Sequence, residues 1–135
     1  MEVYEAAQAI EELERQGYDV ALYDARFAKP VDVELVRTLV DAGVTILTVE
    51  EHTLAGGFGS CVLEACVERH ISTDSIHCLG MAEDWVYQDS RRGQLELTGL
   101  DAAGIARRVR AILDKRSVTT TPRIHVDVSR TEVLG

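Results

Sequence analysis

The stretch VTILTVEEHTLAGGFGSCVLEA, residues 44–65, carries the signals of a strand, a turn and a helix in immediate succession. Its first part is a short apolar run rich in β-branched side chains, which is typical of a strand buried on both faces of a parallel sheet. Glu50, Glu51 and His52 follow this run, so we expect the strand to end there. The apolar run consists of Val44, Ile46, Leu47 and Val49.

Three glycines come next, and we refer to residues 50–60 as the glycine turn. Gly56, Gly57 and Gly59 supply positions that are open to positive φ and that allow another backbone or a ligand to come close. Ser60 then opens an expected helix with apolar residues at helical spacing. We therefore predict a tight turn at the carboxyl end of a buried strand.

The rest of the chain alternates helices and strands around this unit. Apolar spacing, capping residues and turn residues predict further helices at residues 2–16, 32–43 and 101–116, and further strands at 20–27 and 75–81. Residues 82–99 read as a loop plus a short helix, and residues 117–122 as a linker before a last strand at 124–128. This alternation predicts the α/β class, a three-layer α/β/α domain with a mainly parallel sheet.

Composition limits the function classes. The chain has 135 residues, of which 46% are hydrophobic, and its net charge is −9. One domain with a real core fits this length. The negative charge argues against nucleic acid or an anionic membrane as partner, and the short apolar runs argue against a membrane span. We expect a cytoplasmic protein, because no signal peptide is visible.

Cysteine and histidine spacing indicates no metal centre. Cys61, Cys66 and Cys78 form an odd set without a C-x-x-C pair, which argues against a disulfide framework or a zinc site. The four histidines are scattered along the sequence and lack metal-ligand spacing; they are His52, His70, His77 and His125. We predict reduced core cysteines and no bound metal.

The glycine turn invites comparison with phosphate-binding loops, because ligands gather at the carboxyl ends of parallel strands. Gly57 and Gly59 begin a G-x-G-x-x-G pattern, but Val62 stands at the third glycine position. The adjacent Glu50 and Glu51 would repel a phosphate. We therefore favour a structural or interdomain turn over a phosphate site.

No catalytic centre follows from spacing. Glu50, Glu51 and His52 are capable of acid–base chemistry, yet no nucleophile accompanies them, and charged residues at a strand end are more often solvated or paired across an interface. Asp24 and Arg26 share one face of an expected strand, where an ion pair or a contact with a partner domain would suit them. We predict no catalytic, cofactor-binding or metal-binding residue in this chain.

Three sequence blocks carry a family resemblance. DARFAKPVD (residues 24–32), VEEHTLAGGFGS (49–60) and GLDAAGI (99–105) occur in an order and at distances that resemble the C-terminal domain of 1-deoxy-D-xylulose-5-phosphate synthases. The middle block, in looser form, also resembles the last domain of transketolases and of 2-oxoacid dehydrogenase beta subunits. The resemblance implies an enzyme that uses thiamine diphosphate and magnesium to join a two-carbon unit from pyruvate to glyceraldehyde 3-phosphate, for isoprenoid and thiamine synthesis.

The departures from the family matter as well. The family's cofactor motif and activating glutamate belong to two preceding domains, and nothing in these 135 residues matches them. The family's aromatic loop also has a different sequence here, between Gly80 and Asp89. The family's domain begins with a strand that this chain lacks, so we expect residues 1–116 to form the domain and residues 117–135 a linker and an extra strand. The chain is then either a cut fragment or a divergent stand-alone relative.

The missing strand leads to a structural expectation. In the family it lies inside the sheet, so its loss would leave the strands at 20–27 and 44–49 with unpaired backbone groups. We predict that the strand at 124–128 pairs with the sheet, in its own chain or swapped from a second copy.

The favoured hypothesis is a C-terminal, dimer-supporting domain of such a synthase, inactive by itself. Its partners would be the catalytic domains of the same polypeptide and a second copy in a homodimer, with thiamine diphosphate and magnesium held elsewhere. The candidate interface is the glycine turn, with Glu50, Glu51, His52, Gly56, Gly57, Gly59 and Ser60. The alternative is an independent module that binds a small ligand or a partner at the same turn.

Overall fold

The chain folds into helices on both faces of a single sheet. A computed structural model describes residues 2–25, 30–81, 90–115 and 123–128. In chain order the elements are α1 (Glu2–Arg15), β1 (Asp19–Asp24), α2 (Val33–Asp41), β2 (Thr45–Thr53), α3 (Phe58–Glu68), β3 (Ile76–Met81), α4 (Arg91–Thr98), α5 (Ala102–Lys115) and β4 (Arg123–Val128).

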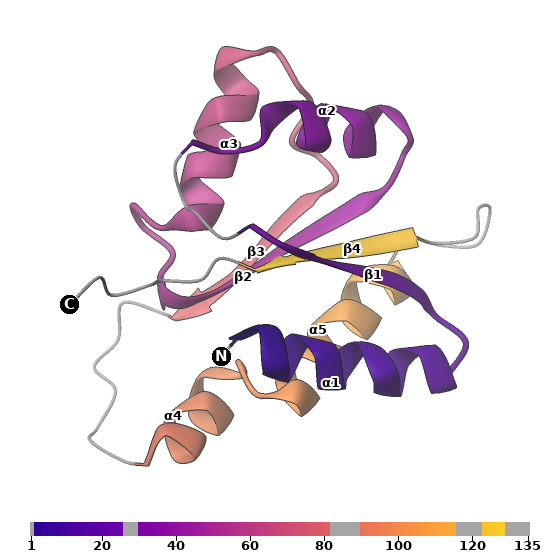
Figure 1. Cartoon of the computed structure of the whole chain (residues 1–135), viewed down its shortest axis with the longest axis vertical. Helices are drawn as coiled ribbons and strands as arrows, with labels where there is room; N and C mark the ends of the chain where they lie inside the picture. Colours follow the sequence, from indigo (N-terminus) through magenta and orange to yellow (C-terminus); the bar gives the residue numbers. More distant parts are fainter. Residues whose placement is uncertain (1, 26–29, 82–89, 116–122, 129–135) are drawn as a thin grey trace.

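The sheet has the strand order β1-β4-β2-β3, and each neighbouring pair is parallel. Helices α2 and α3 cover one face, whereas α1, α4 and α5 lie on the other (Figure 1). The predicted three-layer α/β/α class with a mainly parallel sheet is therefore confirmed. None of the helices in the described ranges is long and apolar enough to cross a bilayer.

Local sequence signals explain where the helices begin. Asp32 caps α2, since its Oδ1 accepts a hydrogen bond of 3.0 Å from the backbone N–H of Leu35. Asp101 does the same for α5, with a 3.0 Å bond from the N–H of Gly104. Both residues stand at the first position of the helices predicted at 32–43 and 101–116, directly before an apolar period.

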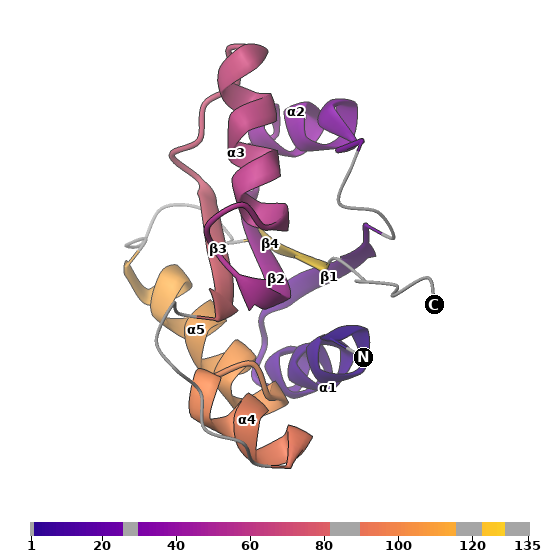
Figure 2. The ribbon, with the colours of Figure 1, turned by 90° about the vertical axis from the view of Figure 1, so that its left-hand side faces the viewer.

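Two apolar cores hold the layers together, one on each face of the sheet. Figure 2 shows the two layers of helices on either side of the strands. Under α1 and α5, Leu13, Ile105 and Val109 are fully buried against the sheet. Beneath α2 and α3 the central residues are Ile46 and Val62. Strand β2 contributes to both cores, because successive side chains point to opposite faces; that is why its apolar run shows no alternation with polar residues.

Strand β2 extends further than the sequence suggested. It continues through Glu50, Glu51 and His52 to Thr53, with an irregularity in its pairing to β3 between Val49 and Thr53. The expectation that these charged residues end the strand is wrong. A shift in the ladder lets the backbone continue to pair while a charged side chain turns into the protein.

The C-terminal strand lies in the interior of the sheet. Along its whole length β4 pairs with β1, from Asp19 opposite Arg123 to Asp24 opposite Val128. On its other side it pairs with β2, from Thr45 opposite Ile124 to Val49 opposite Val128. The predicted pairing of this segment with the sheet is confirmed, within its own chain.

Some expectations fall on residues outside the described ranges. These are Arg26 and the end of the first predicted strand, the loop at residues 82–89 with its departure from the family pattern, and the linker at 117–122. The proposed face shared by Asp24 and Arg26 is among them.

Removing β4 should abolish cooperative folding. Because β4 is the partner that joins β1 to β2, a chain ending at residue 116 would expose backbone groups on both strands. Each buried unpaired group costs about 1–3 kcal/mol, against a total stability of about 5–15 kcal/mol for a small domain. We expect deletion of residues 117–135 to cause aggregation or loss of a cooperative thermal transition, followed by circular dichroism.

A shorter truncation provides the control. Deletion of residues 129–135 leaves β4 in place and should preserve the transition. An unchanged melting temperature in the longer deletion would show that β4 contributes nothing to the fold.

Candidate functional site

The glycine turn lies where β2 ends and α3 begins, at the carboxyl edge of the sheet (Figure 2). Helix α3 starts at Phe58 with Gly57 as its N-cap, two residues before the predicted start at Ser60. Gly57 has no side chain with which to cap the helix, so the first amides of α3 need another acceptor.

Glu50 is that acceptor. Its side chain is 1% exposed, and its two carboxylate oxygens accept hydrogen bonds from successive amides of α3. The Phe58 N–H donates to Oε1 at 3.0 Å, and the Gly59 N–H donates to Oε2 at 2.7 Å. A carboxylate is a strong acceptor, and the positive end of the helix dipole stabilises its charge. Of the two alternatives expected for this charged residue, solvated or paired across an interface, the first is wrong for Glu50, because the amides of α3 replace water as its hydrogen-bond donors.

The glycines make this contact sterically feasible. A Cβ on Gly57 would overlap Glu50 Oε1 and lie 2.6 Å from the Thr53 carbonyl oxygen. A Cβ on Gly59 would lie 2.7 Å from Cys78 Sγ and 2.8 Å from Thr48 Oγ1. Both positions therefore need glycine, because a side chain at either one would collide with the β2 and β3 atoms that lie against the start of α3.

Positive φ is required at only one of the three glycines. Gly56 has a φ of +70°, and nothing lies within 4 Å of where its Cβ would be. The φ of Gly57 is −85°, which any residue adopts. The three glycines therefore serve two different purposes, one conformational and one steric.

Beneath the turn lies a polar group of side chains that sequence reasoning missed. Thr48 is fully buried on β2, and its Oγ1 makes no well-aligned hydrogen bond within the described residues. Cys78 on β3 lies beside it. Burial raises the pKa of the Cys78 thiol above its ordinary value, the Glu50 carboxylate raises it further, and polar contact with Thr48 lowers it in part. The thiol is therefore protonated and unreactive at neutral pH.

The other predicted residues of the turn face outward or close the loop. His52 is exposed, and its Nδ1 lies 3.2 Å from the Thr53 carbonyl oxygen. The Ser60 hydroxyl donates to the Leu54 carbonyl, and the Gly57 N–H donates to the same oxygen at 3.2 Å. Glu51 is half-buried. The structure thus brings Glu50, Gly57 and Gly59 into one cluster and leaves His52 at the surface.

This geometry bears on the chemistry considered for the turn. A phosphate at the start of α3 would have to displace the Glu50 carboxylate from the Phe58 and Gly59 amides. Glu50 is also a poor general base, since both oxygens already accept hydrogen bonds in a closed environment. Across the described ranges, no group of three His, Cys, Asp or Glu side chains is placed to hold a metal ion.

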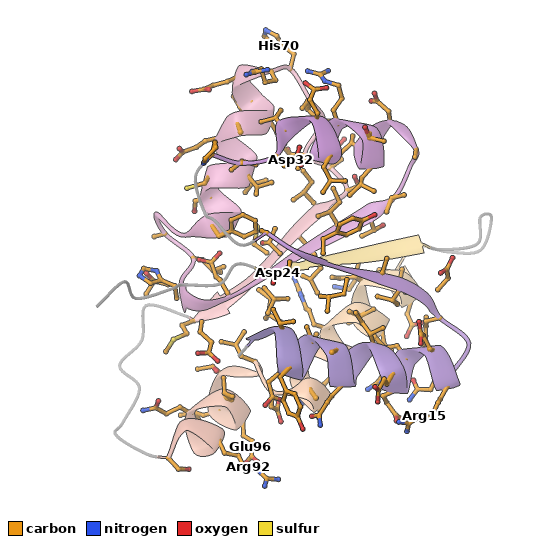
Figure 3. All side chains as sticks on the ribbon, in the orientation of Figure 1. Arg15, Asp24, Asp32, His70, Arg92 and Glu96 are labelled. Atoms are coloured by element: carbon orange, nitrogen blue, oxygen red, sulfur yellow. The ribbon has the colours of Figure 1, made fainter. Side chains whose placement is uncertain are left out.

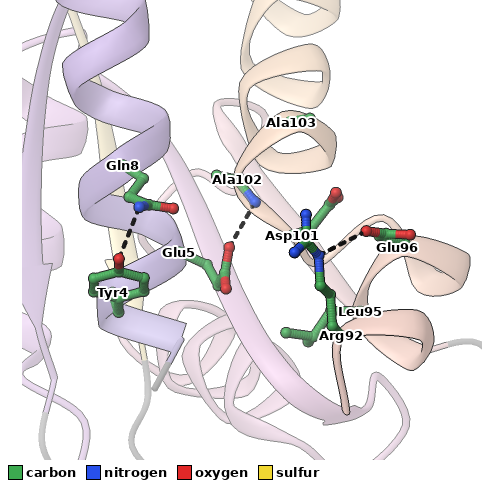
Figure 4. Close-up of a pocket in the computed structure, with 9 residues that line it drawn as sticks. All are labelled: Tyr4, Glu5, Gln8, Arg92, Leu95, Glu96, Asp101, Ala102 and Ala103. Carbon is green, nitrogen blue, oxygen red and sulfur yellow. Dashed lines mark hydrogen bonds and ion pairs between the residues drawn. The ribbon is translucent and has the colours of Figure 1, made fainter. Parts of the chain in front are cut away.

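A second concave region lies on the opposite face of the sheet (Figure 4). It has a volume of about 650 Å³ between α1, α4 and the start of α5. Its polar groups are paired with each other: Glu5 Oε2 accepts from the Ala102 N–H at 2.9 Å, and Arg92 pairs with Glu96 at 3.2 Å. Figure 3 shows Arg92 and Glu96 together at the surface of α4. The Glu5 carboxylate thus accepts from the first amide of α5, and the Arg92–Glu96 pair is an exposed i,i+4 pair within α4.

A sequence signal for the buried cluster did exist. Thr48 interrupts an otherwise apolar run and is two residues before Glu50, so the two share a face of β2 if the strand continues. The role of Cys78 had no such signal, because its position under Gly59 depends on how β3 pairs with β2.

Comparisons with known proteins give a consistent result. The profile of the family described as "Transketolase, C-terminal domain" matches residues 1–105. The chain is 38% identical over 120 residues to a 1-deoxy-D-xylulose-5-phosphate synthase of Synechococcus sp. (strain JA-2-3B'a(2-13)), covering 89% of this chain and 18% of that protein. It is 37% identical over 107 residues to 1-deoxy-D-xylulose-5-phosphate synthase 2 of Geobacter sulfurreducens, covering 79% and 17% respectively.

A relative from Listeria welshimeri, also a 1-deoxy-D-xylulose-5-phosphate synthase, is 36% identical over 108 residues. The match covers 80% of this chain and 17% of that protein. The chain therefore spans less than a fifth of the length of these relatives, and the similarity extends through most of its own length.

The close approach at Gly57 predicts a specific loss of stability. We expect Gly57→Ala to lower the free energy of unfolding by about 1–3 kcal/mol, because the new methyl group displaces the Glu50 carboxylate. Urea melts measure this change. Gly56→Asn is the matched control: Asn tolerates positive φ better than most residues, and its Cβ would have nothing within 4 Å, so its melt should shift less than that of Gly57→Ala. Equal melts for Gly57→Ala and wild type would contradict the cap.

The Cys78 thiol predicts a loss of stability at alkaline pH. Its pKa is raised in the folded state, so folding favours the protonated thiol. This contribution is complete below the unfolded pKa and is lost as pH rises from about 8.5 through the folded pKa. Between pH 8 and 10.5, under reducing conditions, the urea midpoint of the wild type should fall more steeply than that of Cys78→Ala. Parallel pH profiles would refute a raised pKa at this thiol.

Proposed function

The chain belongs to the transketolase C-terminal domain family, and on this premise we propose that it is the C-terminal domain of a 1-deoxy-D-xylulose-5-phosphate synthase. The whole enzyme would join pyruvate and glyceraldehyde 3-phosphate to give 1-deoxy-D-xylulose 5-phosphate and CO2, for isoprenoid and thiamine synthesis. The role of this domain would be to pack against the catalytic domains and to support a homodimer in the cytoplasm.

The coverage of the relatives is the observation that carries this proposal. Identity of 36–38% runs through at least 79% of this chain, yet the matches take up only 17–18% of proteins that are named as synthases. A segment of this kind would contribute a domain to the synthase rather than the whole reaction. We propose residues 1–116 as that domain and residues 117–135 as a linker and an additional strand.

The residues of the glycine turn do not fit thiamine diphosphate or its magnesium. A diphosphate needs amide or cationic donors, and the first amides of α3 already donate to Glu50. The negative charge of Glu50 would also repel a diphosphate bound at the start of α3. We therefore place the cofactor and its metal in the catalytic domains and derive no catalytic step from this chain.

The glycine turn is the proposed surface for those domains. Its backbone is fixed by the Glu50 bonds to α3 and by the Ser60 bond to Leu54, so an interface formed there would cost little ordering entropy. Leu54 is 37% exposed at the tip of the turn, beside the exposed His52. An apolar side chain on a rigid turn suits contact with another domain. The alternative of an independent ligand-binding module has no comparable support.

A chimera tests the proposal. The matching C-terminal segment of the Geobacter sulfurreducens synthase is replaced by this chain, and product formation is compared with that of the same enzyme lacking the segment. We expect the chimera to be active and the truncated enzyme to be inactive. Leu54→Asp in the chimera should reduce activity at least about tenfold, since a buried charge at an interface costs more than 1.4 kcal/mol.

Val67→Asp is the matched control. Val67 is 69% exposed near the other end of α3, so its chimera should keep full activity. The free chain should release no heat on titration with thiamine diphosphate and magnesium. An inactive chimera that folds, or low-micromolar cofactor binding by the free chain, would overturn the proposal.

A further inference from the structure

We propose that β4 is an exchangeable strand, and that the slot between β1 and β2 accepts the β4 of a second copy of this chain. The inference starts from the sheet topology. β4 is the last element of the described chain, yet it lies between β1 and β2 and pairs with both (Figure 1). Of the described elements, every one that surrounds the slot precedes β4 in the sequence.

The slot is complete without a covalent link to the strand that fills it. Strand β1 presents one edge, from Asp19 to Asp24, and β2 presents the other, from Thr45 to Val49. Helices α1 and α5 pack against each other through buried apolar side chains on the β1 side, and α3 packs against β2 on the other face. If β4 leaves the slot, no other described element has to move with it, whereas removal of β2 would also displace α3.

An empty slot is unstable in water. It exposes two facing rows of backbone N–H and C=O groups, each of which needs a partner, and open edges of this kind recruit other strands. The occupant must be extended, run parallel to β1 and β2, and bond on both of its edges. These requirements exclude a helix and any segment that is able to pair on only one side.

A second copy provides an occupant with the correct register. Its β4 has the same sequence, so each register pair, such as Ala21 with His125 or Leu47 with Val126, can form between chains as it does within one. Reciprocal exchange leaves no slot empty and produces a closed two-fold dimer. The monomer and the exchanged dimer have the same number of backbone hydrogen bonds between β4 and its neighbours. The equilibrium between them therefore depends on residues 116–122 and on protein concentration.

The equilibrium between monomer and exchanged dimer predicts that the fraction of dimer rises with protein concentration. A tethered strand has an effective concentration of the order of millimolar. Full-length chain refolded from urea at about 1 µM should therefore be monomeric, and refolding at about 1 mM should yield a dimer that persists on dilution. Size-exclusion chromatography with light scattering distinguishes the two. Deleting residues 118–121 should shift the population toward dimer, because a shorter tether hinders closure within one chain.

Cross-linking identifies the exchanged strand. A chain with Ala21→Cys and a differently tagged chain with His125→Cys are refolded together at high concentration and oxidised, and peptide mapping locates the disulfide. We expect a link between the two introduced thiols across chains. The doubly substituted chain, refolded at low concentration, should form the same link within itself.

A mismatched pair controls for random collision. Glu64 is exposed on α3, away from β1, so His125→Cys refolded with a Glu64→Cys chain should give only background linkage. The proposal is overturned if high-concentration refolding yields only monomer, if the dimer lacks the link between chains, or if the doubly substituted chain fails to link within itself. None of these outcomes depends on the synthase assignment.

Discussion

The parallel pairing of β4 with both β1 and β2 is the constraint on which the rest of the structure depends. Within the described chain, β1 meets the remainder of the sheet only through this strand. The core under α1 and α5 rests on β1 and β2 together, so it requires the spacing that β4 sets between them. A strand at the end of the sequence therefore determines whether elements formed much earlier become one sheet, which makes the fold depend on non-local contacts.

The second determinant is the bond between Glu50 and the first amides of α3. A buried carboxylate is costly unless it is well hydrogen-bonded, and a helix with a glycine N-cap has amides without an acceptor. The Glu50 carboxylate and these amides satisfy each other: the N–H groups of Phe58 and Gly59 donate to its two oxygens at 3.0 and 2.7 Å. The consequence is a turn whose backbone is fixed from inside the protein, with Leu54 and His52 left at the surface. A negative charge at the point where many α/β proteins bind phosphate also occupies the amides that an anion would need.

These two features distinguish a packed scaffold from the polar turn at its carboxyl edge. The scaffold consists of apolar packing on both faces of the sheet, with capped helices and with two thiols, Cys66 and Cys78, whose pKa is raised by burial. At the carboxyl edge, the polar groups of the glycine turn hold its backbone through internal hydrogen bonds. In this member of the transketolase C-terminal domain family, the carboxyl edge of the sheet is thus organised by hydrogen bonds internal to the glycine turn.

The sequence by itself determined the alternation of helices and strands, the α/β class and the family, because capping residues such as Asp32 and Asp101, apolar periodicity and the block VEEHTLAGGFGS are local signals. It also identified the segment at 124–128 as a strand that joins the sheet. Only the tertiary structure decided that β2 continues through His52, that Glu50 turns inward, that α3 begins at Phe58, and that Thr48 and Cys78 lie beneath Gly59. Each of these features depends on a partner that is distant in sequence or on the register between β2 and β3. A charged residue such as Glu50 is expected to be solvated unless the structure shows which amides replace its water.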